Sequence, residues 1–244
     1  QEVAFWNTQL ASLQTQGVTC QLLNATQAQA LEPGLGQEIA WLNALHFPDS
    51  ESINPRLWAH YLRMQAQAMG AIFRTGISVQ KISSQPTGLE ISGQLHPFDA
   101  IVLCTGAKHQ LTESLGLRLP LMPIWGYSVT APVRDALQAP RAAIMDWAQQ
   151  ATISRMGQRI RITAGLEMGS LLILPQVQVW RGNRGYLPDG LPAVGPSGHP
   201  NVWLNIAHGS HGISLAAGCA RAIADMVQRQ TPAIDMQAFS PQRF

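Results

Sequence analysis

The chain has 244 residues, of which 46% are hydrophobic, with 21 Gly, 16 Pro and a mean hydropathy near zero. A chain of this length can bury roughly 70% or more of its unfolded surface, so one large or two modest globular domains are expected and intrinsic disorder is excluded. The net charge is +2, and the 14 Arg and 2 Lys form no basic run, which argues against a nucleic-acid-binding protein.

The first part of the chain predicts two helices with a strand between them. Apolar residues at mostly helical spacing predict an amphipathic helix over residues 3–16 that ends at Gly17. After a loop, residues 39–47 are apolar enough for a strand. Asn54 and Pro55 form a suitable N-cap and first-turn pair for a helix that runs to about Met69.

The region that follows predicts short strands and one buried strand. We expect strands at residues 71–73 and 78–82, a hairpin at 88–93, and a buried strand at 100–104 that leads into a glycine turn at Thr105-Gly106. This order of elements is typical of a nucleotide-binding α/β layer.

The second half of the chain predicts a change to antiparallel sheet. Strands alternate with Pro-containing turns from 119 to 162, which indicates a second sheet capping the first domain, and another sheet-like stretch is expected at 169–175. The chain then predicts a strand at 201–205, a glycine turn at 209–212 and a helix at about 213–229.

Cysteine usage and the start of the chain bear on the compartment. Cys20, Cys104 and Cys219 include no CxxC pair, which argues for a reducing compartment and against a structural zinc or a disulfide framework. No apolar stretch reaches the roughly 20 residues of a membrane span, and no secretory signal pattern is present. The first residue is not Met, so we expect that an upstream segment has been removed.

Two motifs carry candidate chemistry. Arg184 precedes a Pro188-Asp189-Gly190 turn and is flanked by glycines, which is either a plain structural turn or a guanidinium fork for a carboxylate. The turn at 207–212, between a strand and a helix, contains His208 and His211. It is either a tight turn with two incidental histidines or an anion-binding turn with free N–H groups at a helix N-terminus.

These segments occur in an order that resembles the D-amino-acid dehydrogenase branch of the FAD-dependent amine and amino-acid oxidoreductases. The resemblance covers the chain from about Gly17 onward. It is carried by five segments: residues 105–107, 117–130, 180–192, 208–212 and 239–244.

The sequence departs from the family pattern in several places. Family members begin with a strand–GxGxxG–helix unit that holds the FAD diphosphate, and that unit is absent here, since the Gly34–Gly36 string lacks the third glycine and follows no strand. The passage at 169–174 replaces a longer family connection. Trp125, Lys108 and Ala207 stand where Lys, an aromatic residue and Gly are usual. The chain is therefore either part of a longer protein or a natural remnant.

The resemblance implies a fold and a reaction. The fold class is α/β (α+β): the remainder of an FAD-binding Rossmann-like domain, at 55–108 and 185–244, plus an antiparallel-sheet substrate domain, at 1–54 and 109–184. The reaction is oxidation of an amino acid, first of all a D-amino acid, by hydride transfer to the flavin, giving an imino acid that hydrolyses to a 2-oxo acid. Such an enzyme serves amino-acid catabolism in the cytoplasm, or on the inner face of the membrane with a peripheral electron acceptor.

The resemblance also assigns roles to residues. Arg184 would bind the substrate carboxylate, and Tyr127 would add a hydroxyl to it or pack in the core. His46 would face the substrate or simply pack, His208 would bind the substrate, and His208 or His211 would add positive potential near the flavin. The residues expected to bind FAD are Val79, Thr105, Gly106, Pro188, Asp189, Gly190, Gly209, Ser210, His211, Gly212 and Ile213. No metal is expected.

Two alternatives remain open at this stage. One is a non-catalytic, flavoprotein-like subunit of a larger complex. The other is a flavoenzyme for glycine, sarcosine, proline or an aminomethyl group on a modified tRNA base, although the low Lys content disfavours the tRNA substrate. The sequence contains no GxSxG, P-loop or HExxH motif, so a hydrolase of those types, a P-loop nucleotidase and a zinc protease are disfavoured.

Overall fold

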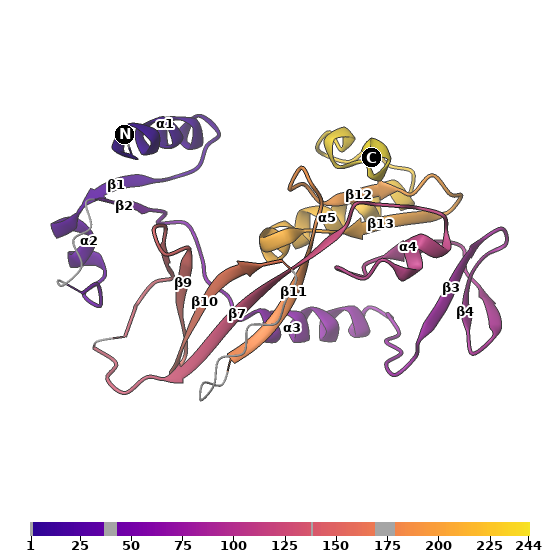
Figure 1. The fold of residues 1–244 in the computed structure, drawn as a ribbon, viewed down its shortest axis with the longest axis horizontal. Helices are drawn as coiled ribbons and strands as arrows, with labels where there is room; N and C mark the ends of the chain where they lie inside the picture. The colour runs from indigo at the N-terminus through magenta and orange to yellow at the C-terminus, as the bar shows by residue number, and fades with distance from the viewer. Residues whose placement is uncertain (1, 37–42, 138, 169–178) are drawn as a thin grey trace. The chain divides into compact units, whose positions relative to one another are not determined.

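A computed structural model describes residues 2–36, 43–137, 139–168 and 179–244 of the chain (Figure 1). The chain divides into two compact units. Unit 1 comprises the described residues of Gln1–Ala59, Tyr127–Gly165 and Leu174–Trp180, and unit 2 those of His60–Gly126, Leu166–Ile173 and Arg181–Phe244. Each unit is a mixture of helices and strands.

Unit 1 begins with helix α1 (Glu2–Thr15), and Gly17, two residues after its last residue, has a φ of +80°. Strands β1 (Gln21–Asn24) and β2 (Asn43–His46) form an antiparallel pair, and helix α2 (Ala25–Leu31) follows β1 directly. Asn24 and Gln27 form a capping box that starts α2, because each side chain bonds the other residue's backbone N–H.

An antiparallel sheet follows later in the chain. Its strand order is β11-β7-β10-β9-β8. The bounds are β7 (Met122–Pro132), β8 (Ile144–Asp146), β9 (Ala151–Met156), β10 (Arg159–Glu167) and β11 (Val179–Tyr186). Strand β9 pairs antiparallel with both β10 and β8, so the antiparallel sheet predicted within residues 119–162 is confirmed for these strands.

Unit 2 contains two three-stranded sheets and two complete α-helices. The meander has the order β3-β4-β5, with β3 (Val79–Ser84), β4 (Thr87–Ile91) and β5 (Gln94–Pro97). The second sheet has the order β12-β13-β6, with β6 (Ile101–Leu103), β12 (Ala193–Pro196) and β13 (Val202–Ile206). Helix α4 (Gln110–Ser114) packs against β3, and α5 (Gly212–Val227) packs against β12 and β13 (Figure 1).

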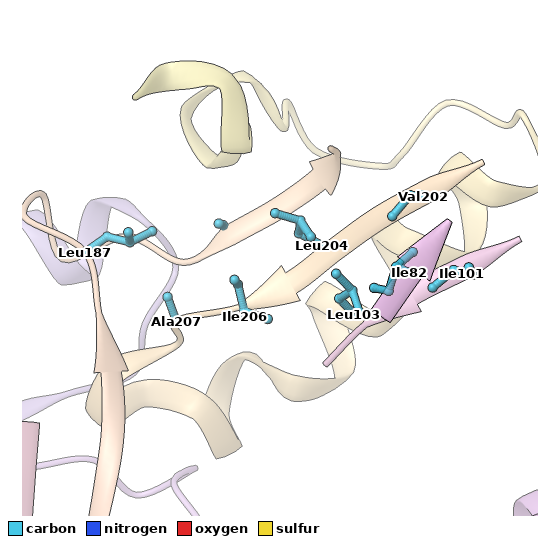
Figure 2. Close-up of a cluster of buried hydrophobic side chains, with 9 residues drawn as sticks. Ile82, Ile101, Leu103, Leu187, Val202, Leu204, Ile206 and Ala207 are labelled. Carbon is cyan, nitrogen blue, oxygen red and sulfur yellow. The ribbon is translucent and has the colours of Figure 1, made fainter. Parts of the chain in front are cut away.

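The hydrophobic core of unit 2 lies along β13 and β6. Figure 2 shows Val202, Leu204 and Ile206 of β13 together with Ile101 and Leu103 of β6, and all five side chains are at most 6% exposed. Leu187, at the end of β11, and Ala207, at the end of β13, belong to the same cluster. The core therefore extends to the point where β13 and β11 end, and it fixes the turns that follow them.

Most of the predicted elements are confirmed, one predicted strand is wrong, and some elements were not predicted. Helix α3 (Pro55–Ala68) begins as expected, since Asn54 Oδ1 accepts bonds from the N–H groups of Arg56 and Leu57. The strand predicted at 71–73 is wrong, because the Ala71 N–H closes the helix end by donating to Ala66 O. Strand β1 and helix α2 were not predicted from the sequence. The stretch at 169–175 and the start of the strand predicted at 39–47 lie outside the described residues.

Glu32 is a buried carboxylate that joins distant parts of unit 1. Its side chain is 6% exposed and accepts backbone N–H groups of Arg141 at 2.7 Å, Ala142 at 2.9 Å and Gly34 at 3.2 Å. Removing it leaves these donors unpaired, so we expect Glu32→Ala to lower the free energy of unfolding by about 2–4 kcal/mol. Urea denaturation measures this. Glu113→Ala, at an exposed position in α4, is the control, and an equal loss in both variants would contradict the role of Glu32.

Candidate functional site

The candidate site begins where two parallel strands end. β13 pairs with β6 in parallel, with Val202 opposite Ile101 and Leu204 opposite Leu103, so their carboxyl ends lie at the same edge of the sheet. The turns that follow are 104–107 after β6 and 207–210 after β13. In α/β sheets, ligands bind outside the carboxyl ends of such strands, where backbone groups and helix N-termini converge.

An open cavity of about 320 Å³ lies at this edge, and all of its lining residues belong to unit 2. It is lined by residues 105–108, 183–185 and 207–209. Five predicted site residues line it: Thr105, Gly106, Arg184, His208 and Gly209. The structure thus brings together three motifs that are up to 104 positions apart in sequence (105 to 209).

Glycines allow the backbone segments around the cavity to approach one another. A Cβ at Gly185 would lie 2.9 Å from the carbonyl oxygen of Gly106, so a side chain there would push the end of β11 away from the turn after β6. Gly209 has a φ of +55°, and a Cβ there would lie 2.9 Å from the Tyr186 ring. Backbone and small side chains thus make up much of the cavity wall, which suits a flat ligand.

Ala207 occupies a backbone conformation that favours glycine. Its φ is +63°, in the left-handed region, and its side chain is 2% exposed. A non-glycine residue pays about 1 kcal/mol or more for this conformation. The buried methyl group offsets part of this cost, and the resemblance described above leads us to expect Gly at this position.

Arg184 is a cationic group of the cavity, and two neighbours hold its guanidinium. Its Nη1 donates to Ser210 Oγ at 3.2 Å. A Cβ at Gly126 would lie 2.8 Å from Arg184 Cζ, which means that the guanidinium lies directly against the backbone of Gly126. Along the same strand, Arg181 stacks on the Trp125 ring at 3.8 Å and pairs with Glu167 at 3.6 Å. Arg184 is therefore the arginine of this strand that lines the cavity.

The turn after β13 uses part of its own hydrogen-bonding capacity. The Ser210 N–H donates to the Tyr186 hydroxyl at 3.0 Å, and the His211 N–H donates to the His208 carbonyl at 3.2 Å. These two donors are paired within the protein and do not point freely to a ligand. An anion-binding role of the turn would have to depend on its remaining N–H groups and on the N-terminus of α5.

His208 lines the cavity without a charge at neutral pH. It is half-buried, and burial lowers the pKa of its imidazole below the ordinary value of 6.5. We therefore expect a proton NMR titration of the His208 ring to give a pKa below 6.5.

The sign of the accompanying stability change follows from linkage. As the pH falls through 6.5, the unfolded histidine takes up a proton before the folded one, so His208 lowers the stability in acid, and the loss is complete below its folded pKa. His208→Gln removes this part of the pH dependence. A folded pKa at or above 6.5 would contradict the expectation.

The Pro188-Asp189-Gly190 turn is held by the end of the chain. Arg243 donates from Nε to Asp189 Oδ2 at 2.6 Å and from Nη2 to Asp189 Oδ1 at 3.1 Å, and Nη2 also reaches Leu191 O at 2.8 Å. The hydrogen bond from Arg243 lowers the pKa of Asp189. Asp189 therefore uses its carboxylate for this ion pair, and a cofactor role for the turn would have to be a role of its backbone.

Several predicted site residues lie outside the cavity. Tyr127 and His46 belong to unit 1, where the Tyr127 ring packs near Gly165 and His46 Nδ1 is buried without a hydrogen-bond partner among the described residues. In unit 2, the predicted turn at 188–190 does not line the cavity. Five other residues that were predicted to bind FAD do not line it either: Val79, Ser210, His211, Gly212 and Ile213. Their assigned roles stay predictions.

A second cavity lies in unit 1 and holds none of the predicted site residues. It has a volume of about 360 Å³ and is lined by residues 52–54, 57 and 154–157. Its polar side chains include Asn54, which caps α3, and Arg155, whose Nε donates to Gly157 O.

Among the helices that the structure describes, none combines the length and apolar character needed to cross a bilayer.

The fold and the cavity define a class of protein: a mixed α/β protein with a ligand cavity, lined in part by cationic side chains, at the ends of a parallel strand pair. Comparison with known families makes this specific, because the model of the FAD dependent oxidoreductase family matches residues 1–170 and 167–226. The chain belongs to this family.

Similar sequences are D-amino acid dehydrogenases. D-amino acid dehydrogenase 2 of Pseudomonas aeruginosa is 33% identical over 90% of this chain, and a D-amino acid dehydrogenase of Bradyrhizobium diazoefficiens is 29% identical over 96%. The matched regions cover 59% and 62% of those proteins, so the chain spans about three fifths of their length.

Solved structures share the fold. Glycine oxidase from Geobacillus kaustophilus has a TM-score of 0.85 at 23% identity and covers 95% of this chain and 69% of its own. L-proline dehydrogenase from P. horikoshii has a TM-score of 0.87 at 15% identity and covers 100% and 73%. The predicted family and fold class are thereby confirmed.

Proposed function

We propose that the whole protein is an FAD-dependent dehydrogenase that oxidises a D-amino acid to its imino acid, which hydrolyses to a 2-oxo acid. The observation that carries the proposal is the position of Arg184 in a cavity at the carboxyl ends of β6 and β13. The relatives at 29–33% identity are named D-amino acid dehydrogenases, which supports this substrate class.

The residues of the cavity fit a flavin and an amino-acid substrate. The backbone around Gly106 and Gly209 lets a planar ring approach closely, and the N-terminus of α5 adds positive potential at that edge. When bound, FAD supplies the two-electron acceptor that oxidation of the Cα–N bond requires. We assign FAD contacts to Thr105, Gly106 and Gly209.

Arg184 binds the substrate carboxylate. Its planar fork can donate two parallel N–H bonds to a carboxylate, which fixes both the position and the rotation of the substrate. Orientation of the Cα–H toward the acceptor is the main demand of the reaction, so no strong base is needed from the protein. The His208 imidazole, neutral at pH 7, lines the cavity as a group able to hydrogen-bond and adds no charge.

The same proposal gives the protein a location and a partner. Cys20, Cys104 and Cys219 are free thiols, as expected in the cytoplasm. A dehydrogenase must pass its electrons on, so we assign it a peripheral electron acceptor on the inner face of the cell membrane. Fractionation of cell extracts, with an antibody against the full-length gene product, tests this assignment.

The test of the function is an absorption spectrum of the purified full-length gene product. We expect flavin bands, and we expect them to bleach when a D-amino acid is added without oxygen. Glycine, sarcosine and L-proline are added in parallel. Bleaching by one of these compounds and by no D-amino acid would show that this compound, and not a D-amino acid, represents the substrate class. A colourless protein that takes up no added FAD would overturn the proposed enzymatic function and indicate a non-catalytic subunit.

A further inference from the structure

We propose that Ser210, supported by Tyr186, is a positioning residue that holds the guanidinium of Arg184 in the orientation that binds a carboxylate. The inference rests on the proposed function for the role of Arg184 and goes beyond it in naming the residues that set the geometry of this arginine. Neither Ser210 nor Tyr186 lines the cavity, whereas Arg184 does. Ser210 meets the cavity through Arg184, to which its hydroxyl is hydrogen-bonded.

One hydroxyl group holds Ser210 at two atoms. The Tyr186 hydroxyl accepts the Ser210 N–H at 3.0 Å and lies 2.5 Å from Ser210 Oγ, where either oxygen can donate. Ser210 Oγ in turn accepts Arg184 Nη1 at 3.2 Å. The three side chains form a hydrogen-bonded series in which Tyr186 fixes Ser210 and Ser210 fixes Arg184.

The guanidinium also lies against the backbone of Gly126. Because Gly126 has no Cβ, Arg184 Cζ can lie only 2.8 Å from the position that a Cβ would occupy. One nitrogen is thus occupied by Ser210 and one side of the group is covered by backbone. Of the five N–H donors of the guanidinium, only the Nη1 donor has a hydrogen-bond partner within the described part of the chain, so the others can serve a ligand in a restricted set of directions.

In Ser210→Ala the guanidinium keeps its planar fork and can still reach the bound orientation, so we expect a larger effect on binding than on the chemical step. An arginine already held in one orientation loses less side-chain entropy when it binds a carboxylate, so loss of the Ser210 hydroxyl weakens binding. The Ser210 side chain is exposed, and a bond in water is worth less than a buried one. We therefore expect a change of about fivefold to tenfold in Kd.

The experiment uses the full-length gene product with FAD and two ligands. Calorimetry gives the Kd of 3-methylbutanoate, a carboxylate that has no C–N bond to oxidise, and steady-state assays give KM and kcat for the best D-amino acid. The variants are Ser210→Ala, Ser210→Thr, which keeps the hydroxyl, and Tyr186→Phe, each alone and in an Arg184→Lys background. Ser12→Ala, on the exposed face of α1, is the matched control.

We expect Ser210→Ala to raise Kd and KM by about fivefold to tenfold with kcat changed by less than about threefold. Ser210→Thr should restore both, Tyr186→Phe should show part of the loss, and Ser12→Ala should show none. In the Arg184→Lys background, Ser210→Ala should add nothing, because the guanidinium that it positions is gone. An equal loss in both backgrounds, or no rescue by Thr, would overturn the proposal.

The design separates the two proposals. If the protein oxidises no amino acid but binds 3-methylbutanoate with the expected dependence on Ser210, the positioning role stands and the proposed reaction falls. If D-amino acids are oxidised and Ser210→Ala leaves both Kd and KM unchanged, the reaction stands and the positioning role is overturned. Absence of both turnover and carboxylate binding would overturn both.

Discussion

Replacing Arg184 by Ala is expected to lower kcat/KM for a D-amino acid by about 10²- to 10³-fold in the full-length protein. Arg184 and Lys108 are the cations among the lining residues of the cavity, and the planar fork of Arg184 is the one that can donate two parallel bonds to a carboxylate. Loss of one partner of a hydrogen-bonded charge pair costs about 2–5 kcal/mol, and each 1.4 kcal/mol is a factor of ten. Steady-state dye reduction at several substrate concentrations measures it.

The variants of Arg184 can be separated by what they keep. Arg184→Lys keeps the charge and loses the planar fork. We therefore expect the variant to bind the substrate but to orient it poorly, so that kcat falls by a larger factor than KM rises. Arg118→Ala is the control, because Arg118 is exposed and outside the cavity. An Arg184→Ala enzyme within threefold of the unmodified protein would show that the carboxylate is bound elsewhere.

Replacing Gly126 by Ala is expected to lower kcat/KM by about 10- to 100-fold while leaving the fold intact. The new Cβ would meet the guanidinium of Arg184, with Cζ at 2.8 Å and Nη1 at 3.2 Å. Since those atoms are the far end of a flexible side chain, the cheapest adjustment is a movement of Arg184 and not of the sheet. A displacement of about 1 Å in a substrate-binding group can cost about 10²-fold in rate.

Two measurements separate this effect from instability. Thermal melts should show Gly126→Ala within a few degrees of the unmodified protein. Gly36→Ala, where an added Cβ has no neighbour within 4 Å among the described residues, should change neither melting nor activity. In an Arg184→Ala background the added methyl has no guanidinium to displace, so Gly126→Ala should cost little more. Full activity of the Gly126→Ala enzyme would contradict this account of the site.

Local interactions explain why some elements were predictable. The helix that begins at Asn54-Pro55 depends on a cap within three residues, and the end of α1 at Gly17 depends on a single left-handed residue. The missed elements depend on distant partners: β1 exists because β2 pairs with it, from Gln21↔His46 to Asn24↔Asn43. Conversely, residues 71–73 look strand-like but have no described partner strand.

The sequence by itself determined the order of the motifs, and their resemblance to a known family indicated the family and the cofactor class. It also indicated Arg184 as the candidate carboxylate ligand. Only the tertiary structure showed that Arg184 lies against Gly126 and beside Ser210, 26 residues further on, and that Asp189 is bound by Arg243, 54 residues away. The physical reason is that such contacts follow from strand register and side-chain packing, which join residues far apart in the chain and leave no mark in local spacing.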